Sequence, residues 1–241
     1  MAKTLLILTG HTKGLGRAIL EGFFAMEQVH ILAISRSVLG LKKEGLEELS
    51  LDLSDLEELE RQLPSLFPQG DYEKVILINN AGWIGEIKPV GKLTPSNIQR
   101  LINLNLSAPM ILTDGFVKAY EGSAAEKIIV NISSGAASKP LSGWSEYCSS
   151  KAGLAMFSKV AAEEMKEKDI KVYSLAPGIV DTEMQGDIRK SDKEDFPALE
   201  RFKDYKNEGR LSTPKEVAEK IIYLLSNPKN FADVVQDVRN F

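Results

Sequence analysis

A tyrosine and a lysine four residues apart are the first side chains whose types and spacing suggest chemistry. Tyr147 and Lys151 fall in a segment, 146–166, whose pattern predicts a helix, so both side chains should lie on one face. An isolated tyrosine ionises at about pH 10, and a nearby ammonium lowers the phenol pKa by stabilising tyrosinate. The pair is therefore a candidate general acid, although the same spacing also occurs as a plain surface contact.

Few other residues compete for acid–base or metal chemistry. The chain has two histidines, His11 and His30, and one cysteine, Cys148. A zinc site, a histidine-based triad or a disulfide framework would have to be built from these three, so we expect no metal site. Neither histidine is placed to serve a serine nucleophile, which argues against a hydrolase. A lone cysteine fits a reducing cytosol, and we expect a cytoplasmic protein.

A glycine-rich stretch follows the first expected strand. Residues 9–16 read Thr-Gly-His-Thr-Lys-Gly-Leu-Gly and precede a helical pattern over 17–24. Glycines let backbone N–H groups approach a pyrophosphate, which then sits at the positive end of the helix. The stretch indicates either a dinucleotide-binding turn or a tight turn whose glycines only permit close packing.

These residues need a scaffold of alternating strands and helices. Short apolar runs predict strands at 4–8, 29–34, 46–51, 75–78, 128–132, 172–175 and 234–238. Several runs are apolar without alternation, which is typical of strands buried on both faces. The expected fold is α/β: a single domain over 1–241, built as a Rossmann-type, doubly wound parallel sheet of about seven strands with helices on both faces.

Helix starts are marked by capping patterns. Ser54 with Glu57, and Thr213 with Glu216, have the capping-box spacing, and Thr94 precedes a proline suited to a first helical turn. These patterns support separate helices between the strands.

One stretch, 185–210, interrupts the alternation. It is densely charged, and Phe196, Leu199 and Phe202 recur at helical spacing. We expect a solvated amphipathic helix on a long loop, within a charged substrate-loop region at about 183–212. The alternative is a flap that covers a substrate.

Composition excludes several classes of protein. Of 241 residues, 43% are hydrophobic and 27% charged, a balance that excludes a disordered tail or a collagen-like fibre. Lys plus Arg number 30 and Asp plus Glu 34, giving a net charge of −4. General attraction to nucleic acid or to an anionic membrane is therefore not expected. No segment approaches the roughly 18 apolar residues of a membrane span.

Together the motifs resemble the short-chain dehydrogenase/reductase family. The glycine spacing matches the family pattern TGxxxGxG, and residues 79–82 resemble its NNAG motif. Ser134, Tyr147 and Lys151 stand at the intervals of the family's catalytic serine, tyrosine and lysine, and Pro177-Gly178 follows the sixth expected strand. The resemblance covers the chain from Thr9 to about Thr182.

The resemblance implies carbonyl reduction with a nicotinamide cofactor. Tyr147 would protonate the carbonyl oxygen, Lys151 would bind the nicotinamide ribose, and Ser134 would orient the oxygen. Asn105 matches the family asparagine that holds a water for proton relay. Ser133 and Asn103 are neighbours that the resemblance, rather than a physical argument, sets aside as catalytic groups.

The residues after the second expected strand favour NADP(H). NAD-preferring relatives carry an acidic residue there, which would repel a 2′-phosphate, whereas this chain has Ser35-Arg36. The planar guanidinium of Arg36 suits a phosphate, and Lys13 adds a second positive charge; the alternative is that both are ordinary surface cations. Asp52 is implied by the resemblance to lie beside the adenine, or it is only a turn residue. The cofactor contacts expected from the resemblance are Gly10, Thr12, Lys13, Gly14, Leu15, Gly16, Ser35, Arg36, Asp52, Leu53, Asn79, Ala81, Gly82, Tyr147, Lys151, Pro177, Ile179 and Thr182.

Within the family the C-terminal half most resembles the sepiapterin reductases, with benzil-reducing bacterial enzymes as relatives. This implies an NADPH-dependent carbonyl reductase that transfers hydride to a vicinal dicarbonyl. Reduction of benzil to benzoin is one alternative, and a non-catalytic NADPH-binding protein is another.

Expected substrate contacts follow from the same resemblance. Asp237 falls where sepiapterin reductases anchor the pterin, with Asp233, or a merely polar chain terminus, as alternatives. Trp144 is either a flat platform for an aromatic substrate or a lid on the core. The expected contacts are Ser133, Ser134, Trp144, Tyr147, Gly178 and Asp237. The family also implies a homodimer or homotetramer, formed through helices expected at 97–120 and 147–166.

Overall fold

The computed structural model describes residues 3–241, which form one sheet of seven strands with helices around it. Every pair of neighbouring strands is parallel, and their order is β3-β2-β1-β4-β5-β6-β7. The predicted Rossmann-type sheet is confirmed. The strands are β1 (Thr4–Thr9), β2 (Val29–Ser35), β3 (Leu46–Ser50), β4 (Lys74–Asn79), β5 (Glu126–Ile132), β6 (Ile170–Ala176) and β7 (Val235–Asp237).

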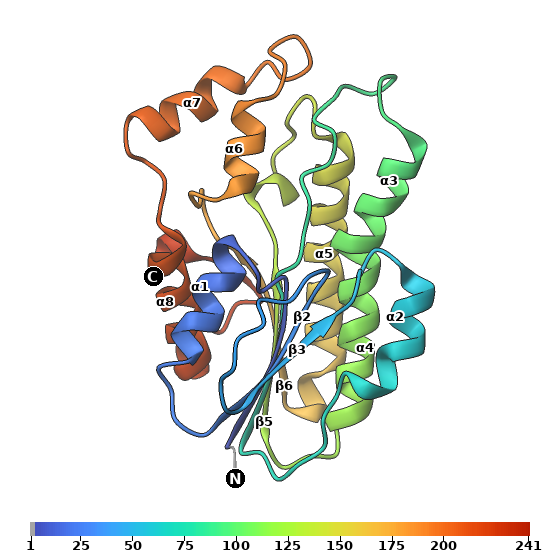
Figure 1. The fold of residues 1–241 in the computed structure, drawn as a ribbon, viewed down its shortest axis with the longest axis vertical. Coiled ribbons are helices and arrows are strands. Elements are labelled where there is room, and N and C mark those ends of the chain that lie inside the picture. The colour runs from blue at the N-terminus through green and yellow to red at the C-terminus, as the bar shows by residue number, and fades with distance from the viewer. Residues whose placement is uncertain (1–2) are drawn as a thin grey trace.

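Helices cover both faces of the sheet. α1 and α8 lie on one face, α2, α4 and α5 lie on the other, and α6 and α7 stand beyond the carboxyl ends of the strands (Figure 1). The helices are α1 (Gly14–Phe23), α2 (Leu56–Gln62), α3 (Pro95–Ile102), α4 (Ala108–Tyr120), α5 (Ser145–Glu164), α6 (Glu183–Arg189), α7 (Leu199–Asn207) and α8 (Pro214–Ser226).

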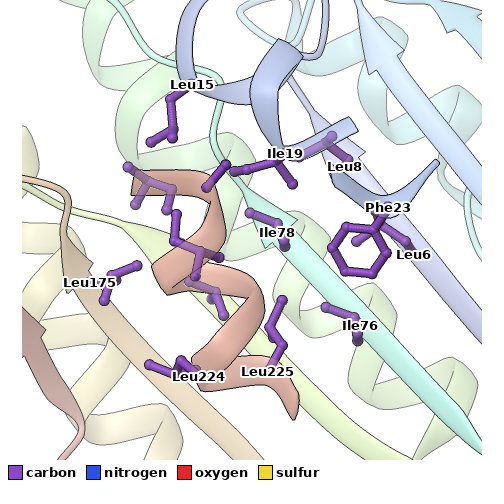
Figure 2. Packing of buried hydrophobic residues seen from close by; sticks show 14 of the residues in the cluster. Leu6, Leu8, Leu15, Ile19, Phe23, Ile76, Ile78, Leu175, Leu224 and Leu225 are labelled. Atoms are coloured by element: carbon purple, nitrogen blue, oxygen red, sulfur yellow. The ribbon is translucent and has the colours of Figure 1, made fainter. Parts of the chain in front are cut away.

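The core lies on both sides of the sheet, which explains the unbroken apolar runs. Leu6 and Leu8 of β1 face a cluster shared with α1 and α8, whereas Leu5 and Ile7 face a second cluster. Figure 2 shows the first cluster, in which Phe23 of α1 packs beside the strand residues. Central strands buried on both faces form a rigid base for the loops at their ends.

The capping signals hold in part. Thr213 and Glu216 form a complete capping box, and α3 begins at Pro95 after Thr94, as predicted. The start of α2 is different, because Asp55 rather than Ser54 caps it, accepting the Glu58 N–H. Ser54 donates its hydroxyl proton to Asp52 Oδ1 at 2.7 Å, and its backbone N–H bonds the same oxygen.

The expectation of one solvated helix over 185–210 is wrong. Two helices, α6 and α7, occupy this stretch, and their apolar side chains are buried rather than solvated. Phe196 is 0% exposed, and it joins Leu199 and Phe202 in a third cluster that also contains Trp144. The charged residues lie on the outer surface, because the apolar face packs against residues at the start of α5.

Two further observations concern membranes and metals. Within residues 3–241, no helix is long and apolar enough to cross a membrane. The same residues contain no group of three or more His, Cys, Asp or Glu side chains arranged to hold a metal ion.

Candidate active site

A cavity of about 760 Å³ lies at the carboxyl ends of the strands. Its walls come from the segments that follow all seven strands and from α5, α6 and α7. In doubly wound sheets, ligands bind at this edge, where the strand order reverses. The cavity brings together most of the expected residues: Gly10, Thr12, Lys13, Gly14, Leu15, Gly16, Ser35, Arg36, Leu53, Ala81, Gly82, Ser133, Ser134, Trp144, Tyr147, Lys151, Pro177, Gly178, Ile179 and Thr182.

The glycine loop leaves no room for side chains. Gly10 and Gly14 have φ angles of +73° and +54°, a region that side-chain-bearing residues rarely adopt. A Cβ atom on Gly16 would lie 2.0 Å from the Gly10 carbonyl oxygen. The backbone is therefore open to a ligand at the N-terminus of α1, where free N–H groups and the helix dipole favour an anion. These residues fit the pyrophosphate of a dinucleotide.

Asn80 holds the glycine loop, whereas its neighbour Asn79 was the residue predicted from the sequence. Asn80 lines the cavity, and its amide nitrogen donates to the carbonyls of Thr9 and Gly10 at 3.0 and 3.1 Å. Asn79 does not line the cavity, because as the last residue of β4 it points into the molecule, where it donates to Asn131 at 2.8 Å. Side chains alternate between the two faces along β4, and this alternation, continued past Ile78, distinguishes Asn79, which points inward, from Asn80.

A buried histidine links the glycine loop to the end of β2. His11 is 0% exposed, and its ring nitrogens lie 2.7 Å from Glu48 Oε1 and 3.1 Å from Ser35 Oγ. Ser35 Oγ also accepts the His11 backbone N–H at 3.0 Å. The Ser35 hydroxyl can therefore donate its proton to His11 Nδ1. His11 Nε2 then carries a proton and donates it to the Glu48 carboxylate.

Glu48 extends this network to the segment after β2. Its carboxylate accepts the backbone N–H groups of Leu39 and Leu41 at 2.7 and 3.0 Å. Burial acts to raise the pKa of Glu48, but these bonds and the contact with His11 outweigh burial and hold the pKa below its usual value. We call His11, Ser35 and Glu48 the strap, since they fix the positions on both sides of Arg36.

The three charged residues expected near the adenosine end are placed differently from one another. Arg36 lines the cavity, as does Lys13, but Lys13 forms an ion pair with Glu183 at the start of α6. Asp52 does not line the cavity; it caps the turn through Ser54 and lies 3.6 Å from Arg100. Burial would raise the pKa of Asp52, yet the hydrogen bonds from Ser54 and the nearby arginines lower it.

The catalytic candidates converge at the middle of the cavity. The Ser134 side chain lies close enough to the Tyr147 phenol to influence its pKa, and the Lys151 ammonium lies 5.9 Å from the centre of the Tyr147 ring. Lys151 Nζ donates to the Ile132 carbonyl at 2.8 Å, which orients the side chain from α5 toward the end of β5.

Burial, not Lys151, controls the Tyr147 phenol. We expected the ammonium to lower the pKa of Tyr147, but desolvation dominates and raises this pKa to about 12, with the Ser134 side chain acting weakly in the opposite sense. Burial also lowers the pKa of Lys151 to about 8, because desolvation penalises the ammonium. The structure thus keeps Tyr147 protonated near neutrality.

Asn105 lies behind the catalytic group, in a helix that is not continuous. A π-helical turn over Asn103–Ser107 separates α3 from α4, whereas the sequence predicted one helix over 97–120. Asn105 is 0% exposed and does not line the cavity; its side chain bonds the N–H and C=O of Trp83 at 2.9 and 2.8 Å. Single π-turns are frequent at functional sites, where they redirect backbone groups.

The far end of the cavity is aromatic. Trp144 stacks on Phe196 with ring centres 5.2 Å apart and meets Tyr147 edge-on at 5.5 Å. Trp144 both lines the cavity and belongs to the third core cluster, so it has features of a platform and of a lid. The Ser133 hydroxyl beside it is buried and has no hydrogen-bond partner within residues 3–241.

Asp237 is not directed at the cavity. Its carboxylate accepts two bonds from the Arg239 side chain, at 2.9 and 2.5 Å, and one from the Arg239 backbone at 3.0 Å. Arg239, which the sequence argument did not consider, lines the cavity in its place.

Comparisons with known proteins give one consistent result. The family model described as short chain dehydrogenase matches residues 4–193. A benzil reductase ((S)-benzoin forming) of Bacillus subtilis (strain 168) is 41% identical, with 92% of this chain and 93% of that protein covered. A sepiapterin reductase of Bos taurus is 31% identical over 95% and 92%. Among solved structures, a 4-hydroxyisoleucine dehydrogenase complexed with NADH has a TM-score of 0.80 at 27% identity, covering 97% and 96%.

Proposed function

Because the chain belongs to the short-chain dehydrogenase family of oxidoreductases, we propose that it is an NADPH-dependent reductase of a vicinal dicarbonyl. The observation that carries this proposal is the meeting of Ser134, Tyr147 and Lys151 in the same cavity as the glycine loop and Arg36. Benzil is the best first substrate, because benzil reductases at 41% and 38% identity resemble this chain more than the sepiapterin reductases do.

The chain's own residues supply acid and orientation. When bound, a reduced nicotinamide supplies the hydride that adds to the carbonyl carbon. Ser134 holds the carbonyl oxygen, and Tyr147 gives its hydroxyl proton to that oxygen as the C=O bond becomes an alcohol. The resulting tyrosinate is stabilised by the Lys151 ammonium, and a proton from solvent restores the phenol. One carbonyl, one hydride and one proton give one alcohol.

The raised pKa of Tyr147 is compatible with this direction. A phenol with a pKa of about 12 carries its proton at neutral pH and is ready to act as an acid. An alkoxide forming on the substrate is much more basic than a tyrosinate, so proton transfer is downhill once hydride has been added. Lys151 would also donate to the ribose hydroxyls of the cofactor, a contact that the family implies.

Arg36 supports a preference for NADPH. It stands beside the cavity at the end of β2, where no carboxylate is present to repel a 2′-phosphate. We predict that Arg36→Asp shifts the preference toward NADH by removing the phosphate contact and adding a repulsive charge. Measured kcat/KM values for the two cofactors test this, and an unchanged ratio would contradict the assignment.

The alternatives have less support. A non-catalytic nucleotide-binding protein has no use for a complete serine, tyrosine and lysine set facing a cavity. A sepiapterin reductase of the expected type needs a free carboxylate for the pterin, whereas Asp237 is bound to Arg239.

We also propose that α4 and α5 form a homodimer or homotetramer interface, since Met110, Met156 and Val160 are exposed on them; the mass in solution tests this. A cytoplasmic location remains our proposal.

The activity is tested by following NADPH oxidation with benzil, sepiapterin and a simple aliphatic ketone, with the chirality of the product recorded. We expect turnover of the diketone, and Tyr147→Phe should lower kcat by about 10²–10⁴-fold while NADPH still binds. Tyr205→Phe is the matched control, since Tyr205 lines the same cavity away from Ser134. Retained turnover in Tyr147→Phe rejects the mechanism, and no turnover of any diketone by the wild type rejects the function.

A further inference from the structure

The aromatic end of the cavity carries positive charge that the cofactor does not account for. Lys139, Arg201 and Arg239 line it, and each comes from a different element: the loop after β5, α7 and the segment after β7. Lys13 and Arg36 belong to the opposite end, beside the glycine loop and β2. Three separate segments thus each place a cation on the wall of the cavity that Trp144 also lines.

Asp237 offsets the charge of Arg239, but no carboxylate among the described residues pairs with the other two cations. Among the described residues, Glu183 is the only acidic side chain of the cavity lining, and it is paired with Lys13. Within residues 3–241 neither Lys139 nor Arg201 has an ion-pair partner; the Arg201 guanidinium lies 5.5 Å from the centre of the Phe202 ring. Since the whole chain has a net charge of −4, this positive charge is a local feature of the cavity.

The end of β7 adds to the same arrangement. Both oxygens of Asp237 are taken by Arg239, and the hydrogen bonds from Arg239, assisted by the charge of Lys139, lower the pKa of Asp237. This carboxylate stays ionised and directed at its own arginine. The cavity therefore meets an arginine paired with its own aspartate here, in place of a carboxylate free to accept bonds from a cationic or amino group.

We propose that the dicarbonyl substrate carries a carboxylate, which Arg201 and Lys139 bind at the cavity rim while the ring rests on Trp144. The proposal rests on the proposed function and specifies its substrate class. A concave surface lined by one sign of charge raises the local concentration of the opposite ion. An exposed ion pair contributes up to about 1 kcal/mol, which corresponds to roughly a fivefold change in kcat/KM for each cation.

A matched pair of substrates tests the proposal: benzil, and benzil with a carboxylate at the 4-position of one ring. For the wild type we expect kcat/KM to be about fivefold higher for the carboxylate, and the advantage should shrink as sodium chloride is raised. Arg201→Gln and Lys139→Gln should each lower the ratio of the two kcat/KM values about threefold to fivefold. Lys203→Gln is the control, since Lys203 has the same charge on the same helix but does not line the cavity.

Each outcome has a distinct meaning. Reduction of benzil with a ratio at or below one overturns the carboxylate proposal and leaves the proposed function intact. An equal fall of the ratio in Arg201→Gln and Lys203→Gln also overturns it, because only the distant field of the protein would then be acting. Reduction of neither diketone overturns the proposed function together with this inference.

Discussion

At the scale of single residues, burial shifts the pKa values of Tyr147 and Lys151 in opposite directions, because it disfavours the charged form of each, tyrosinate in one case and ammonium in the other. The pKa of Tyr147 is raised to about 12 and that of Lys151 is lowered to about 8. Tyr147 therefore keeps its proton throughout the physiological pH range. Lys151 is the one of the two whose charge changes close to that range.

The pH dependence of reduction follows from the Lys151 shift. The ammonium that stabilises tyrosinate is present below about pH 8 and is lost as pH rises through that value. We predict that kcat falls between pH 7 and pH 9. Lys151→Arg should be slower at every pH but show no fall near pH 8, since a guanidinium keeps its charge. A wild-type profile that is flat to pH 10 contradicts this assignment.

The placement of Tyr147 and Lys151 on one helix, with both side chains at the cavity, could be predicted, because spacing along a helix determines which side chains share a face. The sequence did not predict their proton affinities. Burial of Tyr147 depends also on Phe196 and the α6–α7 region, which are distant along the chain and match no family pattern. The ion pairs of Lys13 and Asp237 were missed for a similar reason, since each partner was visible in the sequence but its orientation was not.

At the scale of elements, the strap joins three strands around the adenosine end of the cavity. His11 follows β1, Ser35 ends β2 and Glu48 lies in β3, so a single hydrogen-bonded group sets the distance between the glycine loop and Arg36. A dinucleotide that spans both loops depends on that distance.

We predict that Glu48→Gln raises the KM for NADPH about threefold to tenfold by replacing charge-assisted bonds with weaker neutral ones, while kcat changes little. The advantage of NADPH over NADH should fall as well, because Arg36 loses its fixed position. Glu47→Gln is the control, since Glu47 is the adjacent residue of β3 and contacts the more exposed His30 at 3.1 Å. A loss confined to kcat would argue against a positioning role.

The π-turn at Asn103–Ser107 shows why element boundaries were harder to predict than elements. Apolar residues keep a helical spacing on both sides of the turn, so the pattern over 97–120 reads as one helix. A change of hydrogen-bond register leaves little trace in such a pattern. The cap of α2 was displaced by one residue because the Ser54 hydroxyl donates to Asp52, and Asp55 accepts the Glu58 N–H instead.

At the scale of the whole molecule, the sheet and the α6–α7 region have separate roles. The sheet positions the glycine-loop end of the cavity through loops on buried strands, and α6 and α7 form the aromatic end by packing on Trp144 (Figure 1). The sheet was predictable because strands between helices leave a strong periodic signal. The burial of the apolar side chains within 185–210 was not predictable, because these few residues stand among many charged ones in the sequence.

We predict that Phe196→Leu raises the KM for the dicarbonyl severalfold and leaves NADPH affinity unchanged, since the ring that supports Trp144 is lost. Steady-state kinetics and a cofactor titration measure the two effects separately. Phe231→Leu serves as the comparison, because Phe231 packs against Phe241 and Tyr223 outside the cavity. Equal effects of the two substitutions would mean that Phe196, in the segment before α7, does not shape the aromatic end of the cavity.

The position of the tryptophans gives the molecule an optical property. The chain has two, Trp83 and Trp144; the first is hydrogen-bonded to Asn105 and the second lines the cavity against Tyr147. Indole emission overlaps the absorption band of a reduced nicotinamide, so a nicotinamide bound in this cavity would accept energy from Trp144. The intrinsic fluorescence of the protein should then fall as the cofactor is added, which reports binding without any attached dye.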